Sequence, residues 1–162
     1  PTHIHLLMTQ DSQPKLLNMV EMPINWQFQD DNARINCLSQ FAVAHESSFE
    51  FAEALKYHRQ ILEIAVQLDD KSQQEVSLYN TANCFRQLSK FNESINYFSR
   101  LIQITRETGN RVLQIAGFWG EGTSYQNLGH YQKAIECFRL QLAIACEMSE
   151  RNWEKSALSS LA

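Results

Sequence analysis

The sequence predicts an all-α fold, a superhelix or solenoid of about three antiparallel helix pairs with part of a fourth. Residues of matching size and polarity recur with a period of 40 positions. Within each period, apolar residues recur at the spacing of three and four that favours helices. The 162 residues include only 5 glycines and 3 prolines, which is too few for the turns of an all-β fold.

The 40-residue period is visible as columns of equivalent residues. One column is always small, a second is always aromatic, and a third is always leucine or phenylalanine. A single helix pair cannot bury both of its faces, so neighbouring pairs must stack to form a core. The three columns are Ala42, Ala82, Gly122 and Ala162; Phe51, Phe91 and Tyr131; and Leu38, Leu78, Phe118 and Leu158.

The first 31 residues do not follow the columns. Pro14 and Pro23 interrupt any long helix in this segment. We expect Trp26 and Phe28 to pack on the first repeat as a cap, because a terminal repeat needs its apolar face covered. The same segment is also compatible with the tail of an upstream domain.

The array of repeats is predicted to occupy residues 32–162. Its full repeats span 31–70, 71–110 and 111–150, and 151–162 is predicted to begin the first helix of a fourth. Polar residues occupy the equivalent position at each seam, namely Asp30, Asp70, Asn110 and Glu150.

Each repeat divides into two helices at a break near its midpoint. The third repeat predicts a helix over 111–128, a break at Gly129-His130, and a second helix over 131–148. The equivalent breaks are predicted at 48–50 and 88–90. Because the chain lacks an initiator methionine and stops inside a helical pattern, we expect it to be a piece of a longer protein.

Composition and charge narrow the function classes. The formal net charge is −4, which argues against a nucleic-acid binder that neutralises phosphates. No apolar run is long enough to span a membrane. The four cysteines show no C-x-x-C spacing, which favours a reducing, cytoplasmic compartment.

The third repeat carries a recognisable motif, Gly122-x-x-Tyr125-x-x-Leu128-Gly129-x-Tyr131-x-x-Ala134-x-x-x-Phe138. This pattern resembles the tetratricopeptide repeat. The 40-residue period is similar to the long-helix variant found in bacterial multidomain signalling proteins and in scaffolds of the G-protein-signalling-modulator type. The first repeat departs most from the family pattern, since it has His45 and His58 where the family prefers aromatic residues.

The resemblance implies a non-catalytic protein-interaction module. In this family, the first helix of each pair lines a concave groove that holds a peptide or helix of a partner protein. The positions that would face the groove include Val43 and Glu46 in the first repeat, Tyr79, Asn80, Asn83, Arg86 and Gln87 in the second, and Trp119, Thr123 and Gln126 in the third.

The second repeat supplies the most specific part of this candidate site. Asn80 and Asn83 resemble the family's N-x-x-N pair, whose amides hold the backbone of an extended peptide. Arg86 follows one turn later and is suited to a ligand carboxylate, and Trp119 or Tyr79 is suited to anchor an apolar side chain. Residues 71–110 carry five basic and three acidic side chains, which favours an acidic ligand.

Other functions remain open from the sequence. The repeats are also compatible with a regulatory or sensor region of a larger signalling enzyme, such as an ATPase, kinase or protease. Self-association through the truncated C-terminal repeat is a further possibility. A thiol or metal hydrolase is a weaker alternative, because Cys84 and Cys137 lie beside packing columns and no Gly-rich phosphate loop or H-E-x-x-H motif occurs. We therefore expect no cofactor and no metal.

Overall fold

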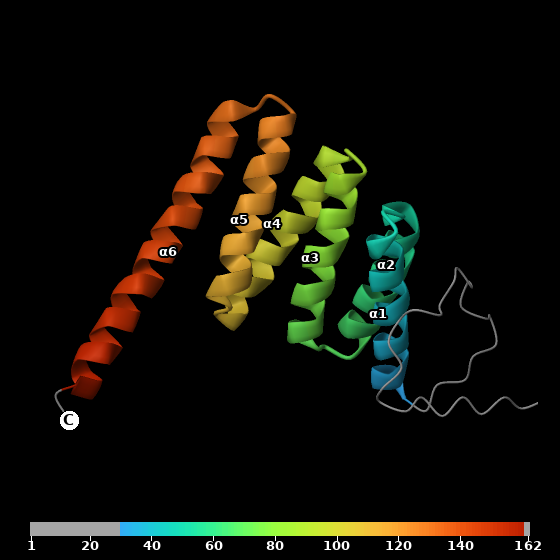
Figure 1. Ribbon diagram of the computed structural model, residues 1–162, viewed down its shortest axis with the longest axis horizontal. Coiled ribbons are helices and arrows are strands. Elements are labelled where there is room, and N and C mark those ends of the chain that lie inside the picture. The colour runs from blue at the N-terminus through green and yellow to red at the C-terminus, as the bar shows by residue number, and fades with distance from the viewer. Residues whose placement is uncertain (1–29, 161–162) are drawn as a thin grey trace, which may run out of the picture.

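The computed structural model describes residues 30–160, with side chains for residues 30–149. Six helices and no strand occur in this part of the chain (Figure 1). The helices form consecutive hairpins, which confirms the prediction of an all-α superhelix. They are α1 (Asp31–Ser47), α2 (Phe51–Gln67), α3 (Lys71–Gln87), α4 (Phe91–Thr108), α5 (Arg111–Asn127) and α6 (Tyr131–Ser160). The predicted cap formed by Trp26 and Phe28 lies outside the described residues.

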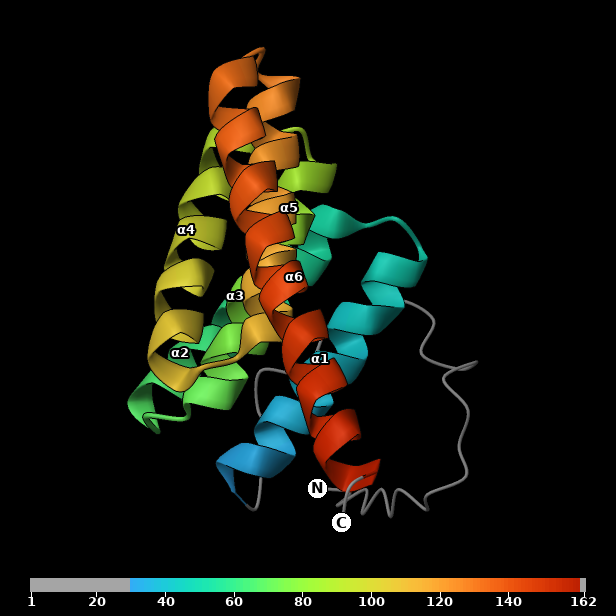
Figure 2. The same cartoon turned by 90° about the vertical axis from the view of Figure 1, so that its left-hand side faces the viewer.

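The hairpins stack in two layers. Each helix packs on the next one in the chain, and among the described helices the only further close approach of backbones joins α3 and α5. Figure 2, seen from the α6 end of the stack, shows α2 and α4 on one side and α1, α3 and α5 on the other. Because α3 approaches α5 while α2 does not reach α4, the layer that contains α3 and α5 is the inner, concave one.

The polar residues at the seams start the first helix of each hairpin. Each side chain accepts a hydrogen bond from the backbone N–H three residues further on, at 2.7, 3.0 and 3.2 Å in chain order. Such N-caps satisfy a backbone donor that the helix itself leaves without a partner. The three capping residues are Asp30, Asp70 and Asn110.

The turns between helices share one backbone feature. A residue with a left-handed conformation, with φ between 51° and 77°, occurs every 20 positions and ends the preceding helix. Glycine adopts this conformation without strain, whereas the other residue types adopt it at a cost. The five positions are Phe49, Asp69, Ser89, Gly109 and Gly129.

The structure differs from the sequence-based expectation after the third hairpin. We expected a new helix near residue 151, but α6 continues from Tyr131 through Glu150 to Ser160. The equivalent seam positions in the earlier repeats hold Asp or Asn, whose short side chains cap a helix. Glutamate is a poor N-cap and a good helix former, so the sequence at this seam favours continuation.

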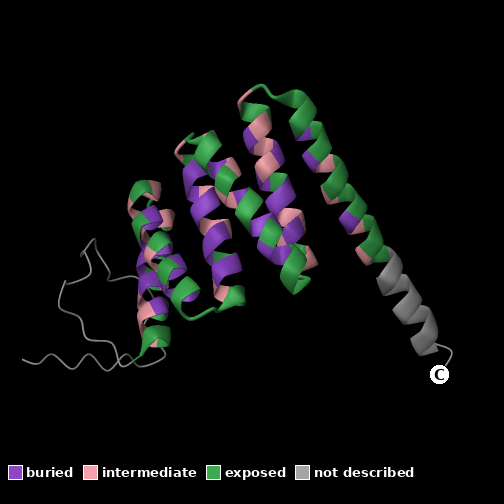
Figure 3. Cartoon of the chain, turned by 180° about the vertical axis from the view of Figure 1, so that it is seen from behind, coloured by how far each residue is buried: buried purple, intermediate pink, exposed green. Residues whose placement is uncertain are grey.

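The small columns lie where helices approach each other most closely. Ala42 and Ala82 are fully buried, and a β-carbon at Gly122 would lie 2.7 Å from the ring of Phe138 on α6. Two further glycines of α5 face α4, where Gly117 contacts Ile102 and Gly120 contacts the ring of Phe98. Figure 3 shows the buried residues concentrated between the helices. The glycines of α5 therefore allow close packing, and α5 remains one helix.

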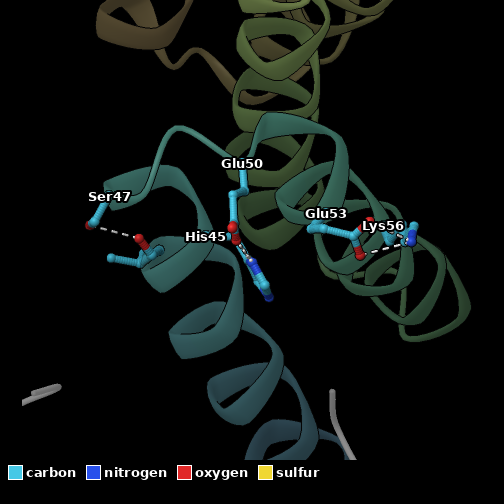
Figure 4. Close-up of polar contacts among 6 residues, drawn as sticks. His45, Ser47, Glu50, Glu53 and Lys56 are labelled. Carbon is cyan, nitrogen blue, oxygen red and sulfur yellow. Dashed lines mark hydrogen bonds and ion pairs between the residues drawn. The ribbon is translucent and has the colours of Figure 1, made fainter. Parts of the chain in front are cut away.

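The first hairpin compensates for its unusual histidine at the turn (Figure 4). His45 Nδ1 lies 2.6 Å from a carboxylate oxygen of Glu50, which precedes α2, and the imidazole stacks on Tyr57 with a centroid distance of 5.5 Å. Ser47 donates to the carbonyl of Val43 at 2.8 Å on the other side of the turn. The histidine thus links the two helices with a polar contact as well as with its ring.

No helix in the described part of the chain is both long enough and apolar enough to cross a membrane.

Candidate functional site

The structure brings together three of the expected site residues between α3 and α5. Asn83 and Arg86 lie one turn apart on α3, and Arg86 Nη2 donates to Oδ1 of Asn83 at 3.2 Å. The same guanidinium lies over the ring of Trp119 on α5, with Cζ 5.0 Å from the ring centroid. A cation over an indole face is attracted by the negative face of the ring, so Arg86 joins the two inner helices.

The charge of Arg86 is not neutralised by an acidic side chain of the described residues. Its Nε–H is buried and has no hydrogen-bond acceptor there. A buried donor without an acceptor is costly, and it is satisfied when an acceptor arrives. Trp119 remains 41% exposed although it carries the guanidinium on one face. The cluster of Asn83, Arg86 and Trp119, here called the α3–α5 cluster, therefore offers a cation and an apolar surface side by side.

The remaining expected residues of α3 and α5 surround this cluster less directly. Asn80 is half-buried and lies one turn before Asn83. The ring of Tyr79 makes an edge-to-face contact with the ring of Phe98 in the core, with 6.3 Å between the ring centroids. Thr123 lies one turn after Trp119 and donates to the carbonyl of Gly120 at 3.0 Å. The more peripheral residues Gln87, Gln126 and, on α1, Val43 are exposed.

Glu46 belongs to a different cluster. Its Oε1 accepts a hydrogen bond from His58 Nε2 on α2 at 3.0 Å and one from the Cys84 thiol on α3 at 3.6 Å. The hydrogen bond from His58 lowers the pKa of the Glu46 carboxyl. Burial, reinforced by the Glu46 carboxylate, raises the pKa of the Cys84 thiol to about 12. Cys84 is therefore a protonated thiol at neutral pH rather than a nucleophile.

The second buried thiol, that of Cys137, also donates to a glutamate, but no histidine of the described residues belongs to its cluster. Cys137 on α6 donates to Glu121 of α5 at 3.8 Å, and burial together with that carboxylate raises the pKa of the thiol to about 12. Ser99 on α4 donates to the other oxygen of Glu121 at 2.7 Å. Glu121 thus makes specific polar contacts to both neighbouring helices.

Sequence reasoning placed Arg86 beside Asn83 but missed the partnership of Glu46 with His58 and Cys84. His45 and His58 each lie in a packing position, and each forms a hydrogen bond with a different glutamate. One signal was available in the columns, since His58 occupies the position that is Phe98 and Phe138 in the later repeats. A polar residue in an aromatic column needs a polar partner nearby.

Comparison with known proteins agrees with this architecture. Two family models, both described as tetratricopeptide repeat, match residues 33–107 and 119–145. The crystal structure of the TPR domain of Arabidopsis FLU is similar with a TM-score of 0.67 and 17% sequence identity, and the match covers 70% of this chain and 96% of the FLU chain. At this identity the likeness shows the fold alone. A search of curated proteins found no match.

Proposed function

Because the chain belongs to the tetratricopeptide-repeat family, whose repeats generally mediate contacts between proteins, we propose that it is a non-catalytic interaction module that binds a peptide or helix of a partner protein on its concave face. The α3–α5 cluster is the proposed centre of this binding surface. The observation that supports it best is the uncompensated Arg86 guanidinium, held by Asn83 and seated on an exposed indole.

The proposed ligand carries a carboxylate. Arginine presents several N–H donors in a plane and binds carboxylates through charge-assisted hydrogen bonds. In this proposal, the Nδ2 of Asn83 donates to the peptide backbone while its Oδ1 positions Arg86. Trp119 contacts an apolar side chain of the ligand next to the carboxylate. The requirement for an acidic or C-terminal carboxylate group follows from the charge of the cluster.

The outer residues of the site have supporting roles in the proposal. Asn80 extends the backbone contacts by one turn of α3. The periphery of the surface consists of Val43, Gln87, Thr123 and Gln126, with Tyr79 beneath the cluster and Glu46 at the α1 side. The four free cysteines support a reducing, cytoplasmic location for such a module.

A peptide-binding experiment tests this function. Immobilised peptides of varied sequence are presented once with a free C-terminal carboxylate and once as the amide, and binding of the whole chain is measured. We expect wild type to favour the free acids. Arg86→Gln should weaken binding by at least about tenfold, since a hydrogen bond to a charged group contributes about 1.5–3 kcal/mol.

Arg100→Gln is the matched control. Arg100 also lies over an aromatic ring, with Cζ 5.1 Å from the centroid of Tyr97, but it is exposed on α4 in the outer layer. We expect this variant to bind like wild type. If the Arg86→Gln variant binds the peptides as tightly as wild type, the proposed site is contradicted. The same holds if the Arg86→Gln and Arg100→Gln variants lose binding to the same extent.

A specific observation also favours self-association as a second function. Leu142 on α6 is 64% exposed, whereas the equivalent residues Leu62 and Ile102 are 7% and 5% exposed because a following hairpin covers them. Tyr131 and Ile135 are exposed on the same helix. We propose that α6 of a second copy covers this apolar stripe, defined here as Tyr131, Ile135 and Leu142.

The opposite end of the stack is a poorer partner for the stripe. The exposed positions of α1 recur every three to four residues and are mostly polar, so a head-to-tail contact would bury amides and carboxylates without partners. Contact between two α6 helices buries apolar surface on both sides, and it closes into a two-fold dimer.

A further inference from the structure

Three metal-ligating side chains meet at the junction of α1, α2 and α3. They come from three different helices, and one ligand atom of each lies within 4.8 Å of the others. The oxygen of the carboxylate is 3.0 Å from the imidazole nitrogen and 3.6 Å from the sulfur. These spacings are close to those between neighbouring ligands of a tetrahedral metal ion with bonds of about 2.0–2.3 Å. The three residues are Glu46, His58 and Cys84.

Two of the three residues in this cluster are buried. His58 is 3% exposed and Cys84 is 1% exposed, and both belong to helices whose packing holds them in place. Glu46 is about one-third exposed in its side chain, so the cluster is open to solvent on one side. A site with three protein ligands and one solvent-facing position is the arrangement in which zinc keeps a water molecule or an exchangeable ligand.

The repeat columns give an independent reason to assign a role to these residues. At the position of His58, the second and third repeats have Phe98, which is fully buried, and Phe138, whose ring lies against Gly122 of α5. Replacing a core phenylalanine with histidine exchanges apolar packing for a polar group that must be satisfied in the interior. That exchange occurs only in the repeat where a glutamate and a cysteine meet the imidazole.

The ligand types select the class of metal. A thiolate and an imidazole favour Zn²⁺ and other late first-row divalent ions, and a carboxylate oxygen is a common third ligand of zinc. Magnesium and calcium prefer oxygen ligands and do not suit this set. We propose that Glu46, His58 and Cys84 form a site for a divalent transition metal ion, with Zn²⁺ as the best match, which ties the first hairpin to the second.

The ion would act as a structural link. It replaces the thiol proton of Cys84, which leaves to the solvent, and His58 binds it through Nε2 after its ring proton has moved from Nε2 to Nδ1. The ion thereby joins α1, α2 and α3 by metal–ligand bonds. Among the described helices, the backbone of α1 lies close to that of α2 alone, so a metal ion would add a bonded link from α1 to α3. Because the metal binds only the assembled junction, it stabilises the folded chain, and this stabilisation grows with the logarithm of the metal concentration above the dissociation constant.

Titration with Co²⁺ and Zn²⁺ tests this site. The untagged chain is stripped with a chelator and titrated with Co²⁺, whose tetrahedral thiolate complexes absorb visible light and show sulfur-to-cobalt charge transfer in the near ultraviolet. We expect one Co²⁺ per chain with a charge-transfer band that Zn²⁺ abolishes. Zn²⁺ at a hundredfold excess over its dissociation constant should raise Tm by about 5–10 °C.

Three variants locate the metal. His58→Phe restores the residue of the other repeats and should fold well, and we expect it to lose at least about 100-fold in affinity. Cys84→Ser should lose the charge-transfer band. Cys137→Ser is the matched control, because Cys137 is also buried beside a glutamate but has no histidine in its cluster, and it should behave like wild type.

The thiolate band separates this site from other binding. His3 and His5 near the start of the chain can take up a metal ion, but they contribute no sulfur. Absence of the band in wild type, or a band that persists in both the His58→Phe and Cys84→Ser variants, would overturn the proposal. In that case, the three residues form only a hydrogen-bonded polar junction.

Discussion

At Gly120 the backbone of α5 lies against the ring of Phe98, and a β-carbon at this position would overlap that ring. Glycine in the middle of a helix is disfavoured by about 1 kcal/mol relative to alanine. Packing therefore outweighs helix propensity at this position. The same close contact holds α5 near α4 and keeps Trp119, the neighbouring residue, at the surface of the inner layer.

We predict that Gly120→Ala destabilises the chain in spite of its better helix propensity. Overpacking of a dense core costs about 1–3 kcal/mol, which exceeds the gain of about 1 kcal/mol from removing glycine. Urea denaturation monitored by circular dichroism measures the change. If Gly120→Ala proves as stable as wild type, the close approach of α5 to Phe98 is wrong.

A double-mutant cycle identifies the ring as the cause. Phe98→Leu alone should destabilise the core, because Phe98 is fully buried. In the Gly120→Ala background, the same change should cost less, since it removes the overlapping ring. Additive effects of the two changes would indicate that alanine at residue 120 disturbs something other than Phe98.

The sequence separation of the contacting residues explains how much of the α3–α5 cluster and of the Glu46 cluster could be predicted from the sequence. Arg86 and Asn83 are three positions apart on one predicted helix, so their contact followed from local spacing alone. The placement of Trp119 under Arg86 depends on the distance between α3 and α5, which no local pattern encodes. Glu46, His58 and Cys84 are separated by 12 and 26 positions, and only the stacking of three helices brings them together.

Among the helices, α6 is distinguished by its uninterrupted passage through the seam at residue 150. The columns predicted the starts of α2, α4 and α6 at their aromatic residues, and these predictions are confirmed. They placed a further break at 150 because Glu150 is polar like Asp70 and Asn110. Polarity was the wrong criterion, since a cap requires a short side chain that reaches the backbone N–H groups of the following turn.

We predict that two substitutions restore the break. Ser149→Gly together with Glu150→Asp gives this seam the pattern found at Gly109-Asn110, with a residue that accepts the left-handed conformation followed by a capping residue. Backbone chemical shifts should then show the end of α6 near residue 148 and a new helix start after 150.

The single substitution Ser149→Gly serves as the control for this pair. Ser149→Gly alone should fray the helix at this point without creating a new N-terminus, since glycine weakens a helix by about 1 kcal/mol and supplies no cap. A continuous helix in the double variant would show that residues beyond the seam, rather than the seam itself, keep α6 straight.

At the scale of the whole stack, the described residues leave the apolar stripe of α6 exposed. Leu62 of α2 and Ile102 of α4 are buried under the next hairpin, while the equivalent residue of α6, Leu142, is exposed. Burial of a leucine side chain contributes about 1.5–3 kcal/mol relative to exposure. Two copies that join their stripes would therefore gain from several apolar residues at once.

We predict a concentration-dependent dimer that Leu142→Glu abolishes. Sedimentation equilibrium on the chelator-treated chain measures the mass, and a charge within the stripe should shift the dimer to monomer. Leu140→Arg is the matched control. Leu140 is also exposed on α6, but it lies outside the stripe and takes here the residue that the second repeat has at the equivalent position, Arg100. A wild-type chain that is monomeric at all concentrations would exclude self-association through α6.

The restriction of helix contacts to near neighbours also bears on how the chain is made. Because each hairpin packs only on elements close to it in the sequence, none has to wait for a distant segment before it can form. During synthesis, neighbouring hairpins can begin to stack as soon as the residues of both have left the ribosome, and each later hairpin adds to the surface already formed. The hairpins can therefore assemble in the order in which they are translated. At each stage the part already folded is a shorter version of the same stack.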